Sequence, residues 1–110
     1  LRPAAVAKVW TGVGAPLETM AVPGVLLAPG DVIVAVELAT LCSSDLHIAA
    51  GHRSAPAPMV LGHEVAGVVE QVGPEVHNVR AGDHVIVCLT FHCGHCGECH
   101  SGNSHRCLTP

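Results

Sequence analysis

Four cysteines at close, regular spacing constrain this chain more than any other feature. They are separated by two, two and seven residues and are Cys93, Cys96, Cys99 and Cys107. The segment around them, residues 92–108, has no hydrophobic period and cannot form a core of its own. Short gaps let the chain reverse so that neighbouring sulfurs converge on one ion. We predict that a bound metal orders this segment, which we call the cysteine lobe.

The predicted metal is zinc in a structural role. Four thiolates complete a tetrahedral shell and leave no position for water or substrate. Iron–sulfur proteins also use two-residue gaps, but their fourth cysteine follows after three residues and precedes a proline, whereas here Leu108 follows Cys107. Unpaired surface cysteines and a disulfide pair are the remaining alternatives. The histidines in the lobe are interpreted as solvated loop side chains and are His92, His95, His100 and His105.

Composition and charge exclude several classes of protein. The 110 residues are enough for one small domain but not for two. The formal net charge is -4 and there is no cluster of Lys or Arg, so nothing predicts nucleic-acid binding. No run approaches the roughly 18 apolar residues of a membrane span, and residues 1–10 lack a secretory pattern. We expect a soluble, cytoplasmic protein in a reducing compartment, where cysteines bind metal.

The ends of the chain and its apolar content indicate that more protein surrounds it. The chain begins with Leu1 rather than Met and stops three residues after Cys107. Apolar residues make up 49% of the sequence and charged residues only 13%, so we expect apolar surface that needs a partner. We interpret the chain as a piece of a longer protein. Unpaired strand edges should favour a homo-oligomer.

Alternating and valine-rich segments predict a mostly β fold with little helix. The expected strands are Ala4–Val9, Leu17–Val22, Asp31–Ala39, Glu64–Val72 and His84–Cys88. The first two flank a glycine-rich turn at 11–15 and should form a hairpin. In the third, alternation predicts one shared face for Val32, Val34, Val36 and Leu38. Cys88 is interpreted as a buried, inert thiol.

A second group of potential ligands lies outside the lobe. Only Ser43–Ala50 has helical character, with Ser43 or Ser44 as the expected N-cap, and Cys42 stands immediately before it. His63 stands at the start of a strand, beside Glu64. A lone cysteine at a strand end usually packs, and a lone histidine is usually a satisfied polar group. Their neighbours favour a site, because acids support metal ligands and a hydroxyl with an imidazole outlines a proton path; these neighbours are Asp45, Glu64, Ser44 and His47.

Four motifs, taken in order, resemble the zinc-dependent medium-chain dehydrogenases/reductases, the superfamily of the zinc alcohol dehydrogenases. They are Cys42-Ser43-Ser44-Asp45-Leu46-His47, Gly62-His63-Glu64, Gly82-Asp83-His84-Val85 and the cysteine lobe. The resemblance implies a GroES-like partial β-barrel with a zinc-binding lobe. Residues 1–110 would form the N-terminal part of the catalytic domain, with the structural-zinc lobe at 92–108.

The resemblance also implies roles for individual residues. Cys42 and His63 would bind a catalytic zinc, with Glu64 close enough to contact the metal or replace a ligand and Asp45 hydrogen-bonded to the ligands. Zinc would act as a Lewis acid on an alcohol while hydride passes to NAD or NADP. Ser44 would receive the alcohol proton and pass it through the cofactor ribose towards His47. The four lobe cysteines would bind a second zinc.

The chain differs from the family pattern at one position and lacks one of its motifs. Many members carry an arginine after the first cysteine to meet cofactor phosphate, but this chain has Ser43, so cofactor contact must differ. No glycine-rich dinucleotide fingerprint is present, so we expect the Rossmann domain and the third ligand of the catalytic zinc to lie outside these residues.

The sequence thus predicts part of a zinc-dependent oxidoreductase. The full-length protein would oxidise a primary or secondary alcohol, or a polyol, and this chain alone would be inactive. A non-catalytic, zinc-stabilised protein-interaction module is the alternative. Such a module needs only the lobe and has no use for Cys42, Ser44, His47 and His63 in this register. A zinc-free quinone reductase of the same superfamily would lack the lobe.

Overall fold

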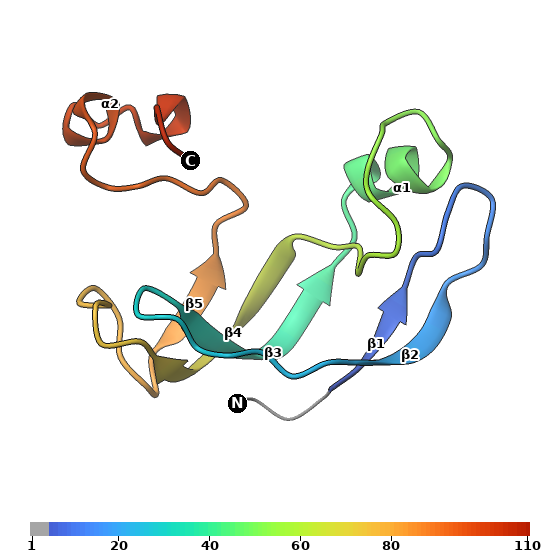
Figure 1. Cartoon of the computed structure of the whole chain (residues 1–110), viewed down its shortest axis with the longest axis horizontal. Helices are drawn as coiled ribbons and strands as arrows, with labels where there is room; N and C mark the ends of the chain where they lie inside the picture. Colours follow the sequence, from blue (N-terminus) through green and yellow to red (C-terminus); the bar gives the residue numbers. More distant parts are fainter. Residues whose placement is uncertain (1–4) are drawn as a thin grey trace.

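The computed structural model describes residues 5–110 as two small antiparallel sheets, short helical segments and long loops (Figure 1). In chain order the elements are β1 (Ala5–Val9), β2 (Glu18–Val22), β3 (Val32–Thr40), α1 (Ser43–Ala49), β4 (Glu64–Val72), β5 (His84–Val87), α2 (Gly97–His100) and the 3-10 helix η1 (Ser104–Arg106). The mostly β fold is therefore confirmed. All five expected strands form within a residue of the predicted ends, although Ala4 lies outside the described residues.

Two expectations about helices were wrong. The N-cap of α1 is Cys42 and not one of the two serines after it. Its backbone N–H donates to Oδ2 of Asp45 at 3.0 Å, so the third helical residue closes the first turn. The lobe also contains short helical turns, α2 and η1, which a search for hydrophobic periodicity cannot detect because neither buries an apolar face.

The larger sheet has the strand order β3-β4-β5, and its outer strands leave edges unpaired by the named strands. Pairing of β3 with β4 runs from Val32↔Val72 to Thr40↔Glu64 and is interrupted by two irregularities, between Ile33 and Val34 and between Val36 and Leu38. The irregularity between Val36 and Leu38 inserts Glu37 into β3 and shifts the side-chain alternation there, so the predicted shared face was wrong for Leu38. The irregularity between Ile33 and Val34 places its extra residue, Glu70, in β4 and leaves the alternation of β3 unchanged. The same pairing brings the end of β3 beside the start of β4.

Gly67 of β4 is required by the bulged partner strand. A Cβ atom at this position would lie 2.2 Å from the carbonyl oxygen of Ala35 and 2.9 Å from Cγ1 of Val34. Contacts this short do not occur between real atoms, so a larger residue must push β3 away. Glycine therefore lets the two backbones approach closely where β3 bulges.

The smaller sheet is the hairpin of β1 and β2, as predicted, paired from Ala5↔Val22 to Val9↔Glu18. Trp10 extends it by pairing with Met59, each backbone N–H donating to the other's carbonyl oxygen at 2.8 and 3.0 Å. Val9 and Trp10 are buried there, and Val69 is buried in the larger sheet. The pairing with Met59 ties the hairpin to the loop that leads from α1 to His63.

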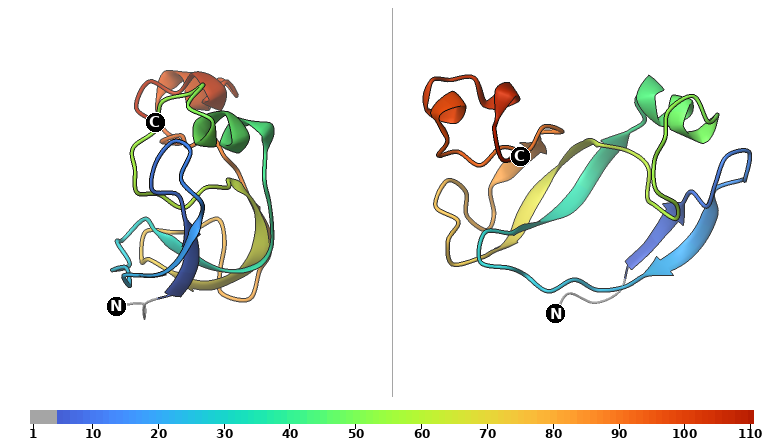
Figure 2. Two further views of the ribbon diagram at one scale, coloured as in Figure 1. Left: turned by 90° about the vertical axis from the view of Figure 1, so that its right-hand side faces the viewer. Right: turned by 45° about the horizontal axis from the view of Figure 1, so that its top comes forward.

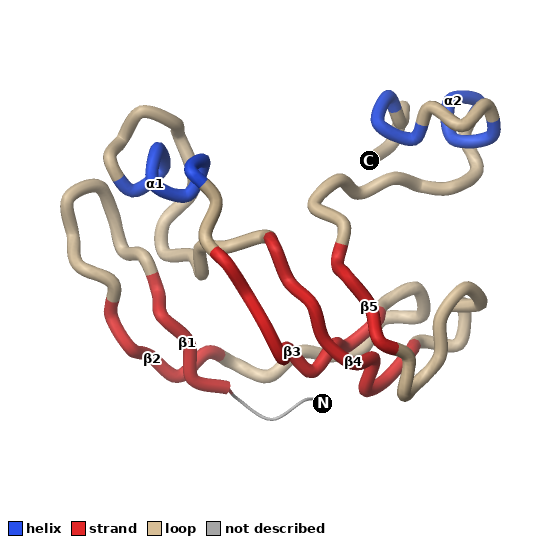
Figure 3. Tube along the Cα trace, turned by 180° about the vertical axis from the view of Figure 1, so that it is seen from behind, coloured by secondary structure: helices blue, strands red, loops and turns tan. Residues whose placement is uncertain are grey.

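The molecule is open rather than closed around one core (Figure 2). Its accessible surface is 7790 Å², whereas a compact monomer of this mass would expose about 5,700 Å². The excess includes large apolar side chains on and after β3 and β5, namely Val36, Leu38, Ile86, Leu89 and Phe91. Figure 3 shows α1 and the cysteine lobe at opposite ends, on the same side of the sheets. Among residues 5–110, no helix combines the length and apolarity needed to cross a bilayer.

Candidate metal centres

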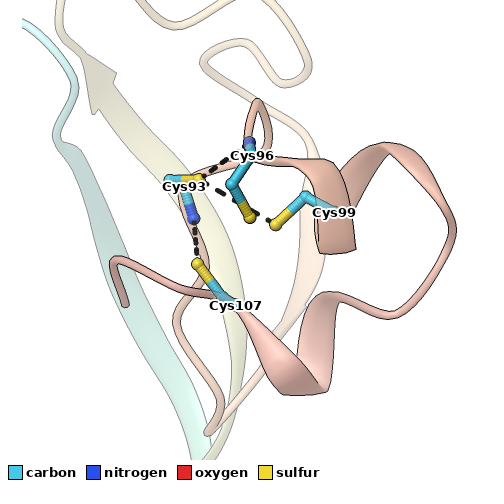
Figure 4. A group of neighbouring side chains, drawn as sticks. All are labelled: Cys93, Cys96, Cys99 and Cys107. Atoms are coloured by element: carbon cyan, nitrogen blue, oxygen red, sulfur yellow. Dashed lines mark hydrogen bonds between the residues drawn. The ribbon is translucent and has the colours of Figure 1, made fainter.

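The cysteine lobe brings its four sulfurs together as the sequence predicts (Figure 4). The ligand atoms of Cys93, Cys96, Cys99 and Cys107 all lie within 4.8 Å of one another. Sγ of Cys93 and Sγ of Cys99 are 3.9 Å apart. Zinc–sulfur bonds of about 2.3 Å in a tetrahedron place sulfurs about 3.8 Å apart, so the thiols fit one zinc ion. None of the four is joined in a disulfide in this structure.

Backbone N–H groups already stabilise negative charge on two of these sulfurs. Sγ of Cys93 accepts from N–H of Cys96 at 3.2 Å and from N–H of His95 at 3.5 Å. Sγ of Cys107 accepts from N–H of Cys93 at 3.3 Å. A hydrogen bond from the Thr109 side chain, together with these backbone donors, lowers the pKa of Cys93 to about 5. This sulfur is therefore the one most ready to bind a cation.

Other sulfurs of the lobe differ in their proton affinity. Hydrogen bonds from the backbone of Leu108 and then of Cys99 lower the pKa of Cys96. Burial raises the pKa of Cys99 to about 12, because desolvation disfavours its thiolate and neighbouring sulfurs add to the effect. Zinc binding must therefore displace the Cys99 proton. The four lobe histidines are all exposed, and none joins the cluster of potential ligands.

A second cluster forms where β3 ends and β4 begins. Ligand atoms of Cys42, His63 and Glu64 lie within 4.8 Å of one another. Cys42 caps α1 directly after β3, and Glu64 is the first residue of β4. Antiparallel pairing of the two strands therefore joins residues far apart in the sequence. A thiol, an imidazole and a carboxylate are all zinc ligands in proteins, so this donor set also fits the metal.

The side chain of Asp45 links the two chain segments that carry this cluster. Its side chain is buried, with the residue only 3% exposed. Oδ1 accepts from N–H of Gly62 at 3.1 Å and lies 3.5 Å from Nδ1 of His63, while Oδ2 accepts from N–H of Cys42 at 3.0 Å. A buried carboxylate needs such partners. Asp45 thus fixes the backbone at both potential ligands, where the sequence predicted a supporting acid.

A hydrogen bond between the Cys42 thiol and the His63 imidazole changes the pKa of both groups. The pKa of Cys42 is lowered, first by hydrogen bonds from the Ser44 side chain and backbone and then by His63, against burial and the Glu64 charge. The pKa of His63 is raised, first by its hydrogen bond with Cys42 and further by the charges of Asp45 and Glu64, against desolvation. Metal binding at His63 must therefore compete with a proton that the imidazole holds more tightly than usual.

The structure places the two predicted proton-path residues on α1 but does not join them. Ser44 lies against the Cys42 thiol, whereas His47 is exposed one turn later. No hydrogen bond links the Ser44 hydroxyl to the His47 ring within residues 5–110. Nδ1 of His47 instead lies 3.4 Å from Nδ1 of His52, with ring centroids 5.7 Å apart. His52 was missed because nothing in its sequence neighbourhood marks it.

Two further contacts escaped sequence reasoning. The Thr40 hydroxyl donates to Oε2 of Glu64. Pairing the predicted strands in antiparallel register would have suggested this contact, because Thr40 and Glu64 are cross-strand partners. Thr109 contacts Cys93 only because the chain folds back after the last lobe cysteine, which no local pattern predicts.

A cavity of about 520 Å³ opens beside the second cluster. Its polar lining includes His63, Glu64, Thr40 and Thr90. The rest of its lining is mainly apolar and includes Leu38, Val65 and Ile86. Cys88 also lines it and is exposed, so the expectation of a buried thiol was wrong. It follows β5 at the rim of the open sheet, where no element covers it. An apolar cavity beside a potential metal site has the character of a small-molecule site.

Residues 28–110 match the family model described as the alcohol dehydrogenase GroES-like domain. That match covers most of the chain and includes both clusters. The chain belongs to this alcohol dehydrogenase family.

The relatives of this GroES-like domain include alcohol dehydrogenases. The chain is 40% identical over 94 residues to putative alcohol dehydrogenase D of Mycobacterium tuberculosis, covering 86% of this chain and 26% of that protein. An alcohol dehydrogenase zinc-binding domain protein from Burkholderia ambifaria superposes with a TM-score of 0.83 at 40% identity, covering 96% of this chain and 28% of that one.

A third relative carries a bound cofactor. An alcohol dehydrogenase from Escherichia coli CFT073, complexed with NADH, superposes with a TM-score of 0.79 at 34% identity, covering 97% of this chain and 31% of that one. The chain thus spans between a quarter and a third of the proteins it resembles.

Proposed function

We propose that residues 1–110 form the N-terminal part of the catalytic domain of a zinc-dependent alcohol dehydrogenase, with residues 92–108 as its structural-zinc lobe. The full-length protein would oxidise a primary or secondary alcohol, or a polyol, and transfer hydride to NAD or NADP. The observation that carries the proposal is the second cluster. Cys42, His63 and Glu64 converge beside an apolar cavity, which a purely structural metal site does not require.

Each cluster would bind one zinc ion, and the two ions would have different roles. Cys93, Cys96, Cys99 and Cys107 would hold one zinc ion in a closed shell and keep the lobe folded. Cys42, His63 and Glu64 would hold the other beside the cavity, where zinc supplies Lewis-acid chemistry to an alcohol. Asp45 would keep Cys42 and His63 at the spacing seen here. A complex of NADH with a relative supports a nicotinamide cofactor for the full-length protein.

Ser44 and His47 are the proposed proton-path residues. Ser44 lies beside Cys42, so its hydroxyl can accept the proton of an alcohol bound at the second cluster. His47 is exposed at the end of α1 and can pass a proton to solvent. Because the two side chains do not touch, a bridging group such as the cofactor ribose must connect them.

Two properties of the whole protein complete the proposal. A reducing, cytoplasmic location belongs to the proposal, because the cysteines of the two clusters are grouped as potential metal ligands. The edges of β3 and β5 and the apolar side chains beside them support assembly with further protein, including a homo-oligomer. The alternative, a zinc-stabilised interaction module, is not favoured, because it gives no role to the second cluster.

The proposal is tested by metal content and activity together. Cys42→Ser and His63→Ala should each remove one zinc from the chain and leave the lobe zinc in place, as measured by native mass spectrometry. In the longer protein, the same variants should abolish NAD(P)-dependent alcohol oxidation. The 110-residue chain alone should show no turnover. Robust turnover by the isolated chain, or full activity without Cys42, would contradict the proposal.

A further inference from the structure

A single contact fixes the side chain of Glu64, which is otherwise the least constrained residue of the second cluster. Asp45 secures Cys42 and the backbone next to His63, but it makes no contact with the Glu64 carboxylate among the described residues. The hydrogen-bond partner of that carboxylate is the Thr40 hydroxyl, which donates to Oε2. Thr40 is the last residue of β3 and lies directly across from Glu64, the first residue of β4.

The surroundings of this pair make the contact important for orientation. Both residues line the cavity beside the cluster, whose other walls are mainly apolar and offer a carboxylate few donors. A glutamate side chain has three rotatable bonds before its carboxylate, so an untethered Glu64, which is exposed, could turn away from the cluster into solvent. The hydroxyl removes part of this freedom, because β3 and β4 hold both backbones in register.

We propose that Thr40 is a positioning residue for the second metal centre. Its hydroxyl holds the Glu64 carboxylate beside Cys42 and His63 and so contributes to metal affinity and to the coordination geometry. The inference rests on the proposed function, because it assumes that these three residues bind a metal. Supporting partners of this kind typically change metal affinity by about 10–100-fold when they are lost. Because Thr40 and Glu64 are exposed, we expect a change at the lower end of this range, about 10-fold.

The test uses cobalt as a spectroscopic substitute for zinc at the second centre. The 110-residue chain is first loaded with one equivalent of zinc, which the four-thiolate lobe takes, and cobalt is then titrated while its visible spectrum is recorded. Thr40→Val removes the hydroxyl and keeps the β-branched shape, and Thr40→Ala is a second variant in case the added methyl group disturbs β3. Thr40→Ser restores the hydroxyl. Thr19→Val, on the β1–β2 hairpin, is the matched control.

Four results support the proposal together. Thr40→Val and Thr40→Ala weaken cobalt binding about 10-fold and change the visible spectrum. Thr40→Ser retains the affinity and spectrum of the unaltered chain, and so does Thr19→Val. In a Glu64→Ala background, Thr40→Val has no additional effect, because the carboxylate that it positions is gone.

Two kinds of failure can be told apart. If the unaltered chain binds cobalt at the second centre and Thr40→Val binds it equally well with the same spectrum, the role of Thr40 is overturned and the proposed function stands. An equal loss from Thr40→Val with and without Glu64 overturns it in the same way. If the zinc-loaded chain takes up no cobalt at all, the second centre itself is refuted and the role of Thr40 falls with it.

Discussion

Asp45→Asn should weaken both the fold around α1 and the second metal centre. The amide can keep one acceptor for N–H of Gly62, but the N–H of Cys42 then faces an NH₂ group. A buried donor left without a partner costs about 1–3 kcal/mol, and this site is buried. We therefore expect a loss of about 2 kcal/mol in the free energy of unfolding. For a domain of this size that corresponds to a fall in Tm of about 8–16 °C.

The loss can be measured by urea and thermal unfolding of the zinc-loaded chain. Trp10 is the only tryptophan and is buried, so its fluorescence reports unfolding directly. Metal affinity at the second centre should fall about 10–100-fold, while the lobe keeps its zinc. Asp31→Asn is the matched control, because Asp31 accepts one backbone N–H from Ala28 at an exposed turn. Equal stability and metal affinity of the Asp45 and Asp31 variants would refute the reasoning.

Three further predictions concern the sheet and the lobe. Gly67→Ala should lower the free energy of unfolding by about 1–3 kcal/mol, because its Cβ would meet the Ala35 carbonyl oxygen at 2.2 Å. Gly97→Ala has open space around it and should leave the stability almost unchanged. Equal urea midpoints for the two variants would contradict this prediction. The zinc affinity of the lobe should fall as the pH is lowered and should fall more steeply below about pH 5, because Cys93, whose pKa is about 5, must then also lose a proton to bind zinc. At neutral pH, zinc uptake should release at least the Cys99 proton, whose pKa of about 12 keeps it bound without metal. A chelator dye measures the loss of zinc, and an unbuffered pH-stat measures the release of protons. Zinc uptake without proton release would contradict the assignment of Cys99 as a zinc ligand.

Much of the fold could be predicted from local patterns. Valine-rich segments and the turns between them located all five strands, and cysteine spacing located the lobe, since each of these signals lies within a few neighbouring residues. The face on which Leu38 lies could not be predicted, because the bulge before it arises from pairing with β4 and the close approach at Gly67. The exposure of Cys88 was missed for a related reason, since only the open side of β5 determines it.

The second metal centre could be predicted from the sequence less well than the strands and the lobe. Cys42 and His63 were weak candidates one by one, and only the resemblance to a known family joined them. The structure adds the physical reason for their proximity, which is the pairing that ends at Thr40 and Glu64. The contact of Thr40 with Glu64 follows only from the pairing of β3 with β4, and the contact of His52 with His47 could not be predicted, because no motif marks it.

Zinc stoichiometry tests the central claim most directly. The chain should be refolded with excess zinc, passed through a desalting column and weighed intact by native mass spectrometry. The account predicts two zinc ions per chain, one after Cys42→Ser, and an unfolded lobe without zinc after replacement of Cys96 and Cys99. A chain that binds only one zinc, with Cys42→Ser leaving that number unchanged, would contradict the claim that two separate centres exist.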